Sequence, residues 1–317
     1  MRILHIENTA GVAYALSRGQ RELGHEADVL ETYWSPLSFP HDKELYYQGK
    51  FLADLRTMRK VVKEARGYDI VHVHAGVHWK RFDIVAISQI LRKPIVVHYH
   101  GSETRLGYGL AYRHLWKHTI VGRPDLLSAH PRAVFIRNPI IGVEKVPLPT
   151  GKLRVLHTFH NPDTKGSAII RECLEKLVDD GVEMEFSILE KVDHERVMEE
   201  MARSHVVIDQ LIDSKTTGLP SIIGVVALEA MAMGRAVVSS FDPAYQRFYP
   251  GCPVLVVDPN GGGLMKAIRE VVADRSILES RAMAGPKYVE SNHSPLSSAK
   301  AVLNVYGTAM PKFVEGS

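Results

Sequence analysis

The stretch GVVALEAMAMGRAVV, residues 224–238, is the most informative part of the sequence because it predicts a buried helix followed directly by a buried strand. Its small and apolar residues favour a helix over Val226–Met233 and a strand over Ala236–Ser239. The only acidic residue of this helix, Glu229, is surrounded by leucine and methionine. A carboxylate in apolar surroundings is unfavourable unless its oxygens accept hydrogen bonds. We therefore expect a ribose diol or a backbone N–H group to satisfy Glu229.

Short β-branched segments alternate with helical patterns through the rest of the chain, which predicts an α/β fold with parallel sheets. The expected strands are Arg2–Ile6, Ala27–Leu30, Asp69–His74, Pro94–Tyr99, Leu126–Ala129, Ala133–Ile136, Leu153–Thr158, Met184–Leu189, Val206–Asp209, Ala236–Ser239 and Pro253–Val257. The other expected helices are Ala13–Leu23, Phe51–Ala65, Ser167–Asp179, His194–Ala202, Gly263–Val272 and a last one within Pro295–Met310. Several strands are almost entirely apolar, as is typical of strands covered on both faces.

The chain of 317 residues is long enough for two domains, and its composition limits the classes of protein that it can be. Three prolines and two glycines between Asn138 and Gly151 indicate a hinge between the halves. The hydrophobic content of 45% and the mean hydropathy of −0.08 are typical of globular proteins in water. The longest apolar run, Ile222–Met233, is too short to span a bilayer. With only Cys173 and Cys252, neither a disulfide framework nor a thiolate zinc site is expected, and a cytoplasmic location fits best.

The charge is divided unevenly between the two halves of the chain. Residues 1–150 hold 21 Lys and Arg against 14 Asp and Glu, whereas residues 151–317 hold 18 against 22. A basic half can attract nucleic acid, anionic lipid headgroups or phosphorylated small molecules. No nucleic-acid recognition motif accompanies the charge, so nucleic acid is not an expected partner.

Two loops that connect a strand to a helix are candidates for binding phosphate. Gly11 follows the first strand, where backbone N–H groups and a helix N-terminus can approach an anion. Lys165 precedes Gly166 and the helix Ser167–Asp179, a place that suits a diphosphate whose charge grows as a bond to it breaks. The alternatives are a simple turn glycine and a solvated surface lysine.

Histidines gather where the strands of the first half end. His72, His74 and His78 follow one strand, and His98 and His100 follow the next. In open parallel sheets that edge is where ligands bind. His72 and His74 share one face of a strand, as a zinc site would require, but no carboxylate or thiolate is spaced to complete one, so no metal is predicted. His100 is the candidate for function because the following Gly101 allows a ligand to approach, and the alternative is a structural histidine.

Gly224-x4-Glu-Ala-Met-Ala-x-Gly-Arg-x-Val-Val resembles the donor-site signature of GT-B glycosyltransferases of family GT4, which contains the pattern E-x7-E. The resemblance extends along almost the whole chain, through Leu23-Gly24-His25, His100-Gly101, Asn138-Pro139 and Lys165-Gly166. It implies two Rossmann-like doubly wound parallel-sheet domains that face a cleft. Residues 1–145 would bind the acceptor, residues 146–295 the nucleotide-sugar donor, and a helix in 296–317 would cross back to the first domain.

The family also implies roles for single residues. Glu229 matches a glutamate that contacts the donor ribose, and Gly224 and Val225 begin the same motif. Lys165 matches the lysine that stabilises the donor diphosphate, Gly11 the loop near that diphosphate, and His100 the histidine that faces the donor sugar. His100 and Lys165 would be the catalytic residues. Such enzymes usually retain the configuration of the sugar and need neither a metal nor a cofactor.

Two positions depart from the family pattern. Ser221 stands where the first glutamate of E-x7-E is expected, and Phe159 or His160 stands where an arginine is expected. A protonated His160 would replace that arginine only in part, because it lacks the fork of guanidinium donors.

The sequence thus predicts a divergent hexosyltransferase of the cell envelope, of glycolipid synthesis or of small-glycoside synthesis. Its expected acceptor is a hydroxyl group, with a glycolipid at the inner face of the membrane as one alternative. The aromatic and basic segment Arg105–Lys117 is expected to help bind that acceptor, and the alternative is that its residues are plain core and solvated surface. The rival functions are a non-catalytic nucleotide-sugar binding protein and a sugar-nucleotide epimerase.

Overall fold

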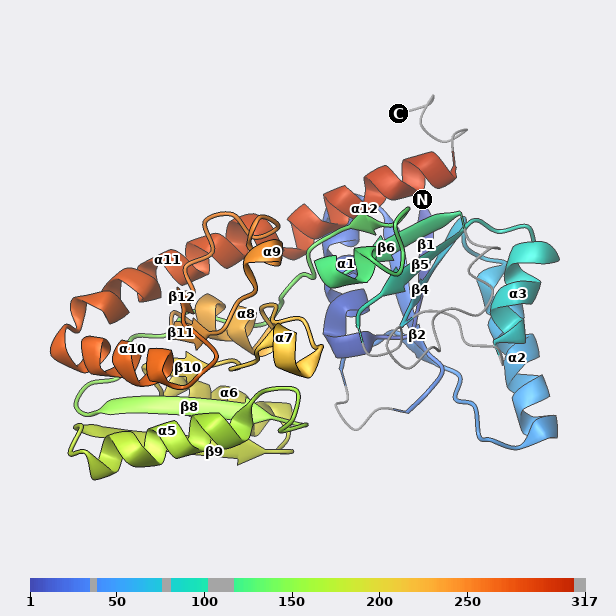
Figure 1. Cartoon of the computed structure of the whole chain (residues 1–317). Coiled ribbons are helices and arrows are strands. Elements are labelled where there is room, and N and C mark those ends of the chain that lie inside the picture. The colour runs from blue at the N-terminus through green and yellow to red at the C-terminus, as the bar shows by residue number, and fades with distance from the viewer. Residues whose placement is uncertain (35–38, 76–80, 102–116, 311–317) are drawn as a thin grey trace. The chain divides into compact units, whose positions relative to one another are not determined.

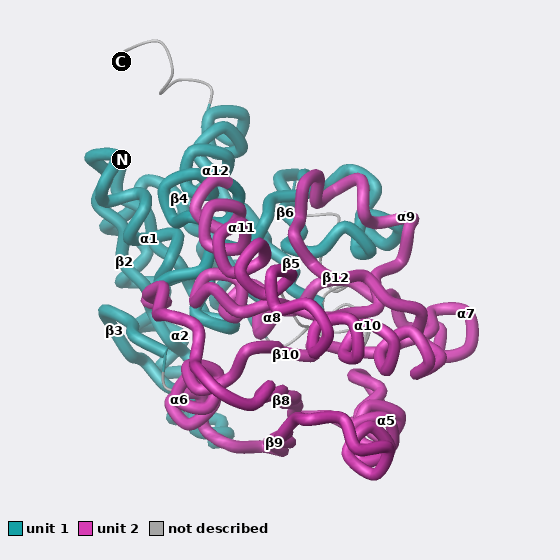
Figure 2. The backbone as a smooth tube through the Cα atoms, turned by 90° about the vertical axis from the view of Figure 1, so that its left-hand side faces the viewer, with its two compact units in different colours: residues 1–141, 292–317 teal, residues 142–291 magenta. Residues whose placement is uncertain are grey.

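The computed structural model describes residues 1–34, 39–75, 81–101 and 117–310 (Figure 1). The chain divides into two compact units, which Figure 2 colours separately. Unit 1 comprises Met1–Ile141 and Asn292–Ser317, and unit 2 comprises Gly142–Ser291. The boundaries expected from the sequence, after residues 145 and 295, lie a few residues further along the chain.

Unit 1 is built on a parallel sheet of seven strands in the order β3-β2-β1-β4-β5-β6-β7. Its strands are β1 (Arg2–Ile6), β2 (Glu26–Glu31), β3 (Lys43–Glu44), β4 (Ile70–His74), β5 (Ile95–Tyr99), β6 (His118–Val121) and β7 (Val134–Phe135). Its helices are α1 (Val12–Glu22), α2 (Phe51–Ala65), α3 (Phe82–Gln89) and α12 (Pro295–Ala309), with short 3-10 turns η1 (Thr9–Gly11) and η3 (Pro124–Leu127).

Alternate residues of each strand in unit 1 point to opposite faces of the sheet, and each face has its own helices. Ile3 and its neighbours pack against α1 and α12, whereas Leu4 and its neighbours pack against α2 and α3. The helices α1 and α12 cross closely at Gly19, where an added Cβ would lie 2.2 Å from the carbonyl oxygen of Pro295. The last helix therefore belongs to unit 1 although it follows unit 2 in the sequence.

Unit 2 is built on a parallel sheet of five strands in the order β12-β11-β10-β8-β9. Its strands are β8 (Leu153–Phe159), β9 (Met184–Glu190), β10 (Val206–Ile208), β11 (Ala236–Ser239) and β12 (Leu255–Val256). Its helices are α5 (Ser167–Asp179), α6 (His194–Ala202), α7 (Ser214–Thr217), α8 (Val225–Ala232), α9 (Pro243–Gln246), α10 (Gly262–Ala273) and α11 (Ser276–His293), whose end extends into unit 1.

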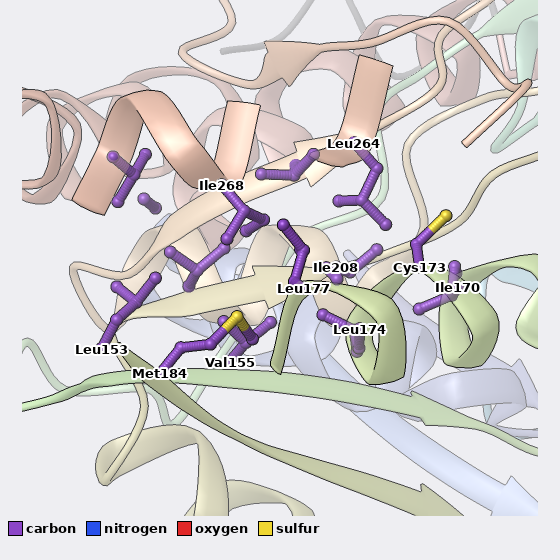
Figure 3. Close-up of a cluster of buried hydrophobic side chains, with 14 of the residues drawn as sticks. Leu153, Val155, Ile170, Cys173, Leu174, Leu177, Met184, Ile208, Leu264 and Ile268 are labelled. Atoms are coloured by element: carbon purple, nitrogen blue, oxygen red, sulfur yellow. The ribbon is translucent and has the colours of Figure 1, made fainter. Parts of the chain in front are cut away.

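The core of unit 2 lies between its sheet and the helices α5 and α10 (Figure 3). Val155 and Ile208 contribute from the strands, Leu174 from α5, and Leu264 and Ile268 from α10. All of these side chains are almost completely buried. On the opposite face, α6 contacts β8, and α8 contacts β10 and β11. This layered packing holds the first turn of α8 beside the carboxyl end of β10.

The strand order reverses once in each sheet. In unit 1 it reverses between β1 and β4, and in unit 2 between β8 and β10. At such a point the loops that leave the two neighbouring strands run to opposite faces of the sheet and open a crevice in which ligands bind. The α/β class with two parallel, doubly wound sheets, predicted from the sequence, is confirmed.

Some elements differ from those predicted. The strand expected at Leu126–Ala129 is wrong, because Pro124 begins the 3-10 turn η3 there. The sheet instead continues through β6, which the sequence analysis did not predict. The helices α3 and α11 were also not predicted. Among the described residues, no helix has the length and apolar character needed to cross a membrane.

Candidate functional site

The strand-order reversal in unit 2 brings a lysine, an aspartate and a glycine together. Lys165 lies in the loop after β8, and its Nζ donates to Oδ1 of Asp209 at 2.6 Å. The other carboxylate oxygen of Asp209 accepts from the backbone N–H of Gly224 at 2.8 Å. The Asp209 side chain is fully buried, whereas that of Lys165 is 21% exposed. Asp209 therefore fixes the lysine ammonium at the start of α8 while leaving part of it open to solvent.

Glycine is required at position 224 because the Asp209 carboxylate and the Lys165 ammonium lie too close to the backbone there to leave room for a side chain. A Cβ there would lie 2.9 Å from Oδ1 of Asp209 and 3.0 Å from Nζ of Lys165. Gly224 is also the N-cap residue of α8, and within the described part of the chain no side-chain capping hydrogen bond forms at this helix end. The first N–H groups of a helix lack partners within the helix and carry partial positive charge. Lys165 and the N-terminus of α8 together form a candidate anion-binding site.

The backbone around Lys165 is held in one conformation. Gly166 adopts the left-handed region with φ +67°, and a Cβ there would lie 2.0 Å from the carbonyl oxygen of Leu211. The N–H of Leu211 in turn donates to the carbonyl of Lys165 at 2.9 Å. The loop after β8 is thus fastened to the segment after β10, so the lysine is positioned before any ligand arrives.

Glu229 lies one helical turn beyond Val225 on the same side of α8. It is buried, and its Oε1 accepts a hydrogen bond from Nε2 of His194 at 2.8 Å. This bond raises the pKa of His194, against the opposing effect of burial, because the carboxylate favours the charged imidazole. The partner expected from the sequence was a ribose or a backbone N–H, and the structure shows a histidine from α6 instead.

The other predicted residues of unit 2 have different surroundings. Ser221 is buried, and its hydroxyl donates to the carbonyl of Ser240 and accepts from the amide of Gln210. His160 is exposed in the loop that leads to Lys165. The structure therefore brings Lys165, from the loop after β8, next to Gly224 at the start of α8, and Val225 and Glu229 follow along that helix. The Ser221 hydroxyl is engaged within the fold.

Gly11 and His100, the predicted site residues of unit 1, lie in connections that follow strands of its sheet. Gly11 has φ +73° and precedes α1, and a Cβ there would lie 3.0 Å from the ring of Phe39. His100 follows β5, and its Nε2 lies 3.0 Å from Nδ1 of His74. The segment Arg105–Lys117, expected to contact an acceptor, falls outside the described residues except for Lys117.

His100 is the outer member of a histidine cluster on the sheet face that α1 and α12 cover. The cluster consists of His5, His72, His74, His98 and His100. Nδ1 of His5 lies 3.0 Å from Nε2 of His74, and Nε2 of His5 lies 2.8 Å from Oε1 of Gln20. Burial lowers the pKa of His5 to about 4. It lowers the pKa values of His72, His74 and His98 well below their usual range, so these imidazoles are neutral.

A second buried polar group in unit 1 surrounds Arg81. Its guanidinium pairs with Glu7 at 2.8 Å and with Asp83 at 2.9 Å. Glu7 follows β1 with φ +70°, a conformation that a residue with a side chain rarely adopts. Burial and the nearby Glu7 raise the pKa of Glu31 to about 8. These charges lie beside the ends of β1 and β2, at the ligand-binding edge of the sheet.

Sequence reasoning missed four of these residues: Asp209, His194, Arg81 and Glu7. Asp209 ends an apolar strand, and a carboxylate at that position is itself a signal for the ligand-binding edge. His194 and Arg81 stand in polar stretches where nothing in the local pattern distinguishes them from surface residues.

The chain is similar in sequence and in fold to known glycosyltransferases. Residues 10–136 match the profile of Glycosyltransferase Family 4. The structure of Anabaena HepE with UDP and glucose aligns with a TM-score of 0.67 at 15% identity, covering 97% of this chain and 100% of that one. The chain has a GT-B fold. Sucrose-phosphate synthase of Thermosynechococcus elongatus aligns to this GT-B chain with a TM-score of 0.67 at 17% identity, covering 98% and 100% of the two chains.

A third GT-B structure, an alpha-glucosyltransferase with UDP and a 13-mer DNA, aligns with a TM-score of 0.70 at 13% identity. The alignment covers 96% of this chain and 99% of that one. No curated protein matches the sequence. At these identities the structural likeness establishes the GT-B fold, and the chemistry has to be argued from the site itself.

Proposed function

We propose that this protein is a glycosyltransferase that moves a sugar from a nucleoside-diphosphate sugar to a hydroxyl acceptor. The observation that carries the proposal is the Lys165 ammonium, fixed by Asp209 at the uncapped start of α8. The match of residues 10–136 to Glycosyltransferase Family 4 supports it from the other unit of the chain. GT-B structures that contain UDP support the same class of donor.

The proposed chemistry is the departure of a nucleoside diphosphate. As the bond between the sugar and the diphosphate breaks, negative charge grows on the leaving oxygen. Lys165 has three N–H donors, one of which is directed to Asp209, and the remaining donors would bind the phosphate oxygens. The backbone N–H groups at the start of α8 would bind the same anion. Donors fixed in this way stabilise the developing charge without rearranging during the reaction.

Glu229 would bind the donor through its ribose. Its carboxylate lies one turn along α8 from the diphosphate position, and a ribose diol can donate two hydrogen bonds to such a group. His194 occupies one of the two oxygens in the structure. Donor binding would therefore use the other oxygen or displace His194, whose side chain is 42% exposed.

Metal independence and retention of configuration form the finer part of the proposal. Both oxygens of Asp209 are engaged, by Lys165 and by Gly224, so this carboxylate is not available to hold a cation at the diphosphate. The lysine would replace such a cation. Retention is inferred from the resemblance to GT4 enzymes, as are the roles of His100 toward the donor sugar and of Gly11 near the diphosphate. The location in the cytoplasm or at the inner membrane face, and a glycolipid as acceptor, stay predictions.

A second candidate function is a non-catalytic protein that binds nucleotide sugars. The observation that favours it is Ser221, whose hydroxyl is already bonded to Ser240 and Gln210 in place of a glutamate directed at the sugar. Such a protein would bind the donor but would neither transfer the sugar nor hydrolyse the donor.

The direct test is turnover by Lys165→Ala. We expect this variant to lose about 10²–10³-fold in kcat, since one charge-stabilising group is removed. Its melting temperature should also fall, because the buried Asp209 loses its cation, so turnover is measured at a temperature where circular dichroism shows the variant to be folded. Donor consumption and acceptor glycosylation would be followed by liquid chromatography. The matched control is Lys176→Ala, which removes an exposed lysine from α5 in the same unit and should keep full activity. Full activity in Lys165→Ala would disprove the assignment of the diphosphate site.

A further inference from the structure

We propose that His5, His72 and His74 bind one divalent transition-metal ion inside unit 1, with zinc as the ion that suits the site best. Each residue offers one ring nitrogen, and the three nitrogens lie within 4.8 Å of one another. The proposal concerns the sheet of unit 1 and does not rest on the proposed transfer activity.

The sheet itself brings the three ligands together. His5 on β1 is the register partner of His72 on β4, and His74 stands two residues further along β4 on the same face. Zinc binds histidine at about 2.0–2.1 Å in tetrahedral geometry, which places two ligand nitrogens about 3.4 Å apart. Nδ1 of His5 and Nε2 of His74 are 3.0 Å apart, close to that spacing. The two rings would need to move apart by only about 0.4 Å to admit the ion.

Each proposed ligand has an acceptor for its second ring nitrogen. Nε2 of His5 lies 2.8 Å from Oε1 of Gln20, and Nδ1 of His72 lies 2.7 Å from the hydroxyl of Tyr306. Nδ1 of His74 lies 3.0 Å from Nε2 of His100. Histidines that bind metals almost always donate their other N–H in this way, which fixes the tautomer and turns the remaining nitrogen toward the ion.

Ligand chemistry selects the kind of ion. The three nearest donors are all imidazoles, which suit zinc and other late first-row ions, whereas magnesium and calcium prefer oxygen. A three-histidine set leaves one tetrahedral position, which a water molecule would fill. The ion would therefore stabilise the buried end of β1 and β4 and, through His74, the ring of His100.

Hydrogen bonding among the histidines does not satisfy the whole cluster. It accounts for His5 and His74, but among the described residues Nε2 of His72 is buried without a hydrogen-bond partner. A second set of three, His74, His98 and His100, also has nitrogens within 4.8 Å. Neither ring nitrogen of His98 has a hydrogen-bond partner in the described part of the chain, so no hydrogen bond selects the tautomer that would turn one of its nitrogens to an ion. We therefore assign the metal site to His5, His72 and His74, because hydrogen bonds orient all three of these rings.

The experiment uses the full chain, stripped of metal with a chelator and confirmed as folded by circular dichroism. Zinc is titrated by calorimetry, and cobalt replaces it as a spectroscopic probe. We expect one ion per chain, a rise in melting temperature with zinc, and the visible absorption bands of four-coordinate cobalt. Tyr306→Phe keeps the ring that packs in the core but removes the acceptor of His72, and it should weaken zinc binding by about 10–100-fold. His72→Gln should weaken it further.

Two matched variants test the assignment. His98→Gln removes a buried histidine from the same sheet face, and His160→Gln removes an exposed one from unit 2, and both should bind zinc as the wild type does. Tyr306→Phe carries the test if His72→Gln does not fold. Folded wild-type protein that binds no zinc and shows no cobalt bands would overturn the proposal. Loss of binding in His98→Gln with binding retained in Tyr306→Phe would overturn it in favour of the other set. Nucleotide binding measured in the same samples reports separately on unit 2.

Discussion

At the scale of single residues, the site depends on partners that are distant in the sequence. Lys165 and Asp209 are 44 residues apart, and Glu229 and His194 are 35 residues apart. The sequence identified Lys165 and Glu229 because each stands at a characteristic place in a strand–helix connection or an apolar helix. Their partners could not be predicted, because only the pairing of β8 with β10 and the packing of α6 bring them near.

Arg81 gives a prediction about stability. Its guanidinium is buried between Glu7 and Asp83, so Arg81→Met would leave two buried carboxylates without their cation. We expect the free energy of unfolding to fall by about 3–5 kcal/mol, measured by urea denaturation. Arg123→Met, which breaks a more exposed pair with Asp125, should lose about 1 kcal/mol or less. If the two variants lose the same free energy of unfolding, then burial of the Arg81 ion pairs adds nothing to the stability of the protein.

Glu31 gives a prediction about pH. Its pKa is raised from 4.5 to about 8, chiefly by burial, so the folded chain holds this proton more tightly than the unfolded chain. The stabilisation is fully present below about pH 4.5 and is lost as the pH rises toward and beyond 8. Between those values the free energy of unfolding should fall by at most about 1.4 kcal/mol per pH unit on account of this group.

Glu31→Gln keeps the shape of the side chain and cannot ionise, so it should remove this part of the pH dependence. Urea denaturation of both proteins at pH 6 and pH 9 measures the difference. If the two proteins lose the same stability between these pH values, the carboxyl group of Glu31 is not protonated in the folded protein near neutral pH.

At the scale of elements, strands with continuous β-branched residues could be predicted and short polar ones could not. β1, β4, β5 and β8 match the expected ranges closely because their apolar runs are fixed by burial on both faces. β6 begins with His118 and Thr119, so its pattern is weak. α11 contains Pro286, a residue that normally ends a helix, and its polar and apolar residues are poorly separated.

The crossing of α1 and α12 gives a prediction at this scale. Gly19→Ala would normally favour a helix by about 1 kcal/mol, but here the new methyl group would meet the carbonyl oxygen of Pro295. We expect a net loss of about 1–3 kcal/mol in the free energy of unfolding, because the two helices must move apart. Gly262→Ala is the matched control, since a Cβ at this helical position meets nothing closer than 3.6 Å. A Gly19→Ala variant as stable as the control would contradict the close crossing.

At the scale of the whole molecule, two units repeat one plan, with charged or polar groups at the point where each strand order reverses. Unit 2 places Lys165 and Asp209 there, and unit 1 places His5 and His74 there. The alternation of strands and helices predicted the class, and the Gly224–Glu229 motif pointed to GT-B. The composition of each site could not be predicted, because it depends on which strands become neighbours.

The central claim is that the start of α8 binds a nucleoside diphosphate, and a thermal-shift panel of UDP, GDP, ADP and CMP, alone and as sugar conjugates, tests it most directly. A ligand at 100 times its dissociation constant should stabilise the protein by about 2.7 kcal/mol. We predict that one base stabilises the wild type, that Lys165→Ala and Glu229→Gln lose the shift, and that Lys176→Ala keeps it. A folded wild-type protein that no nucleotide stabilises would contradict the account and leave the GT-B fold without its donor.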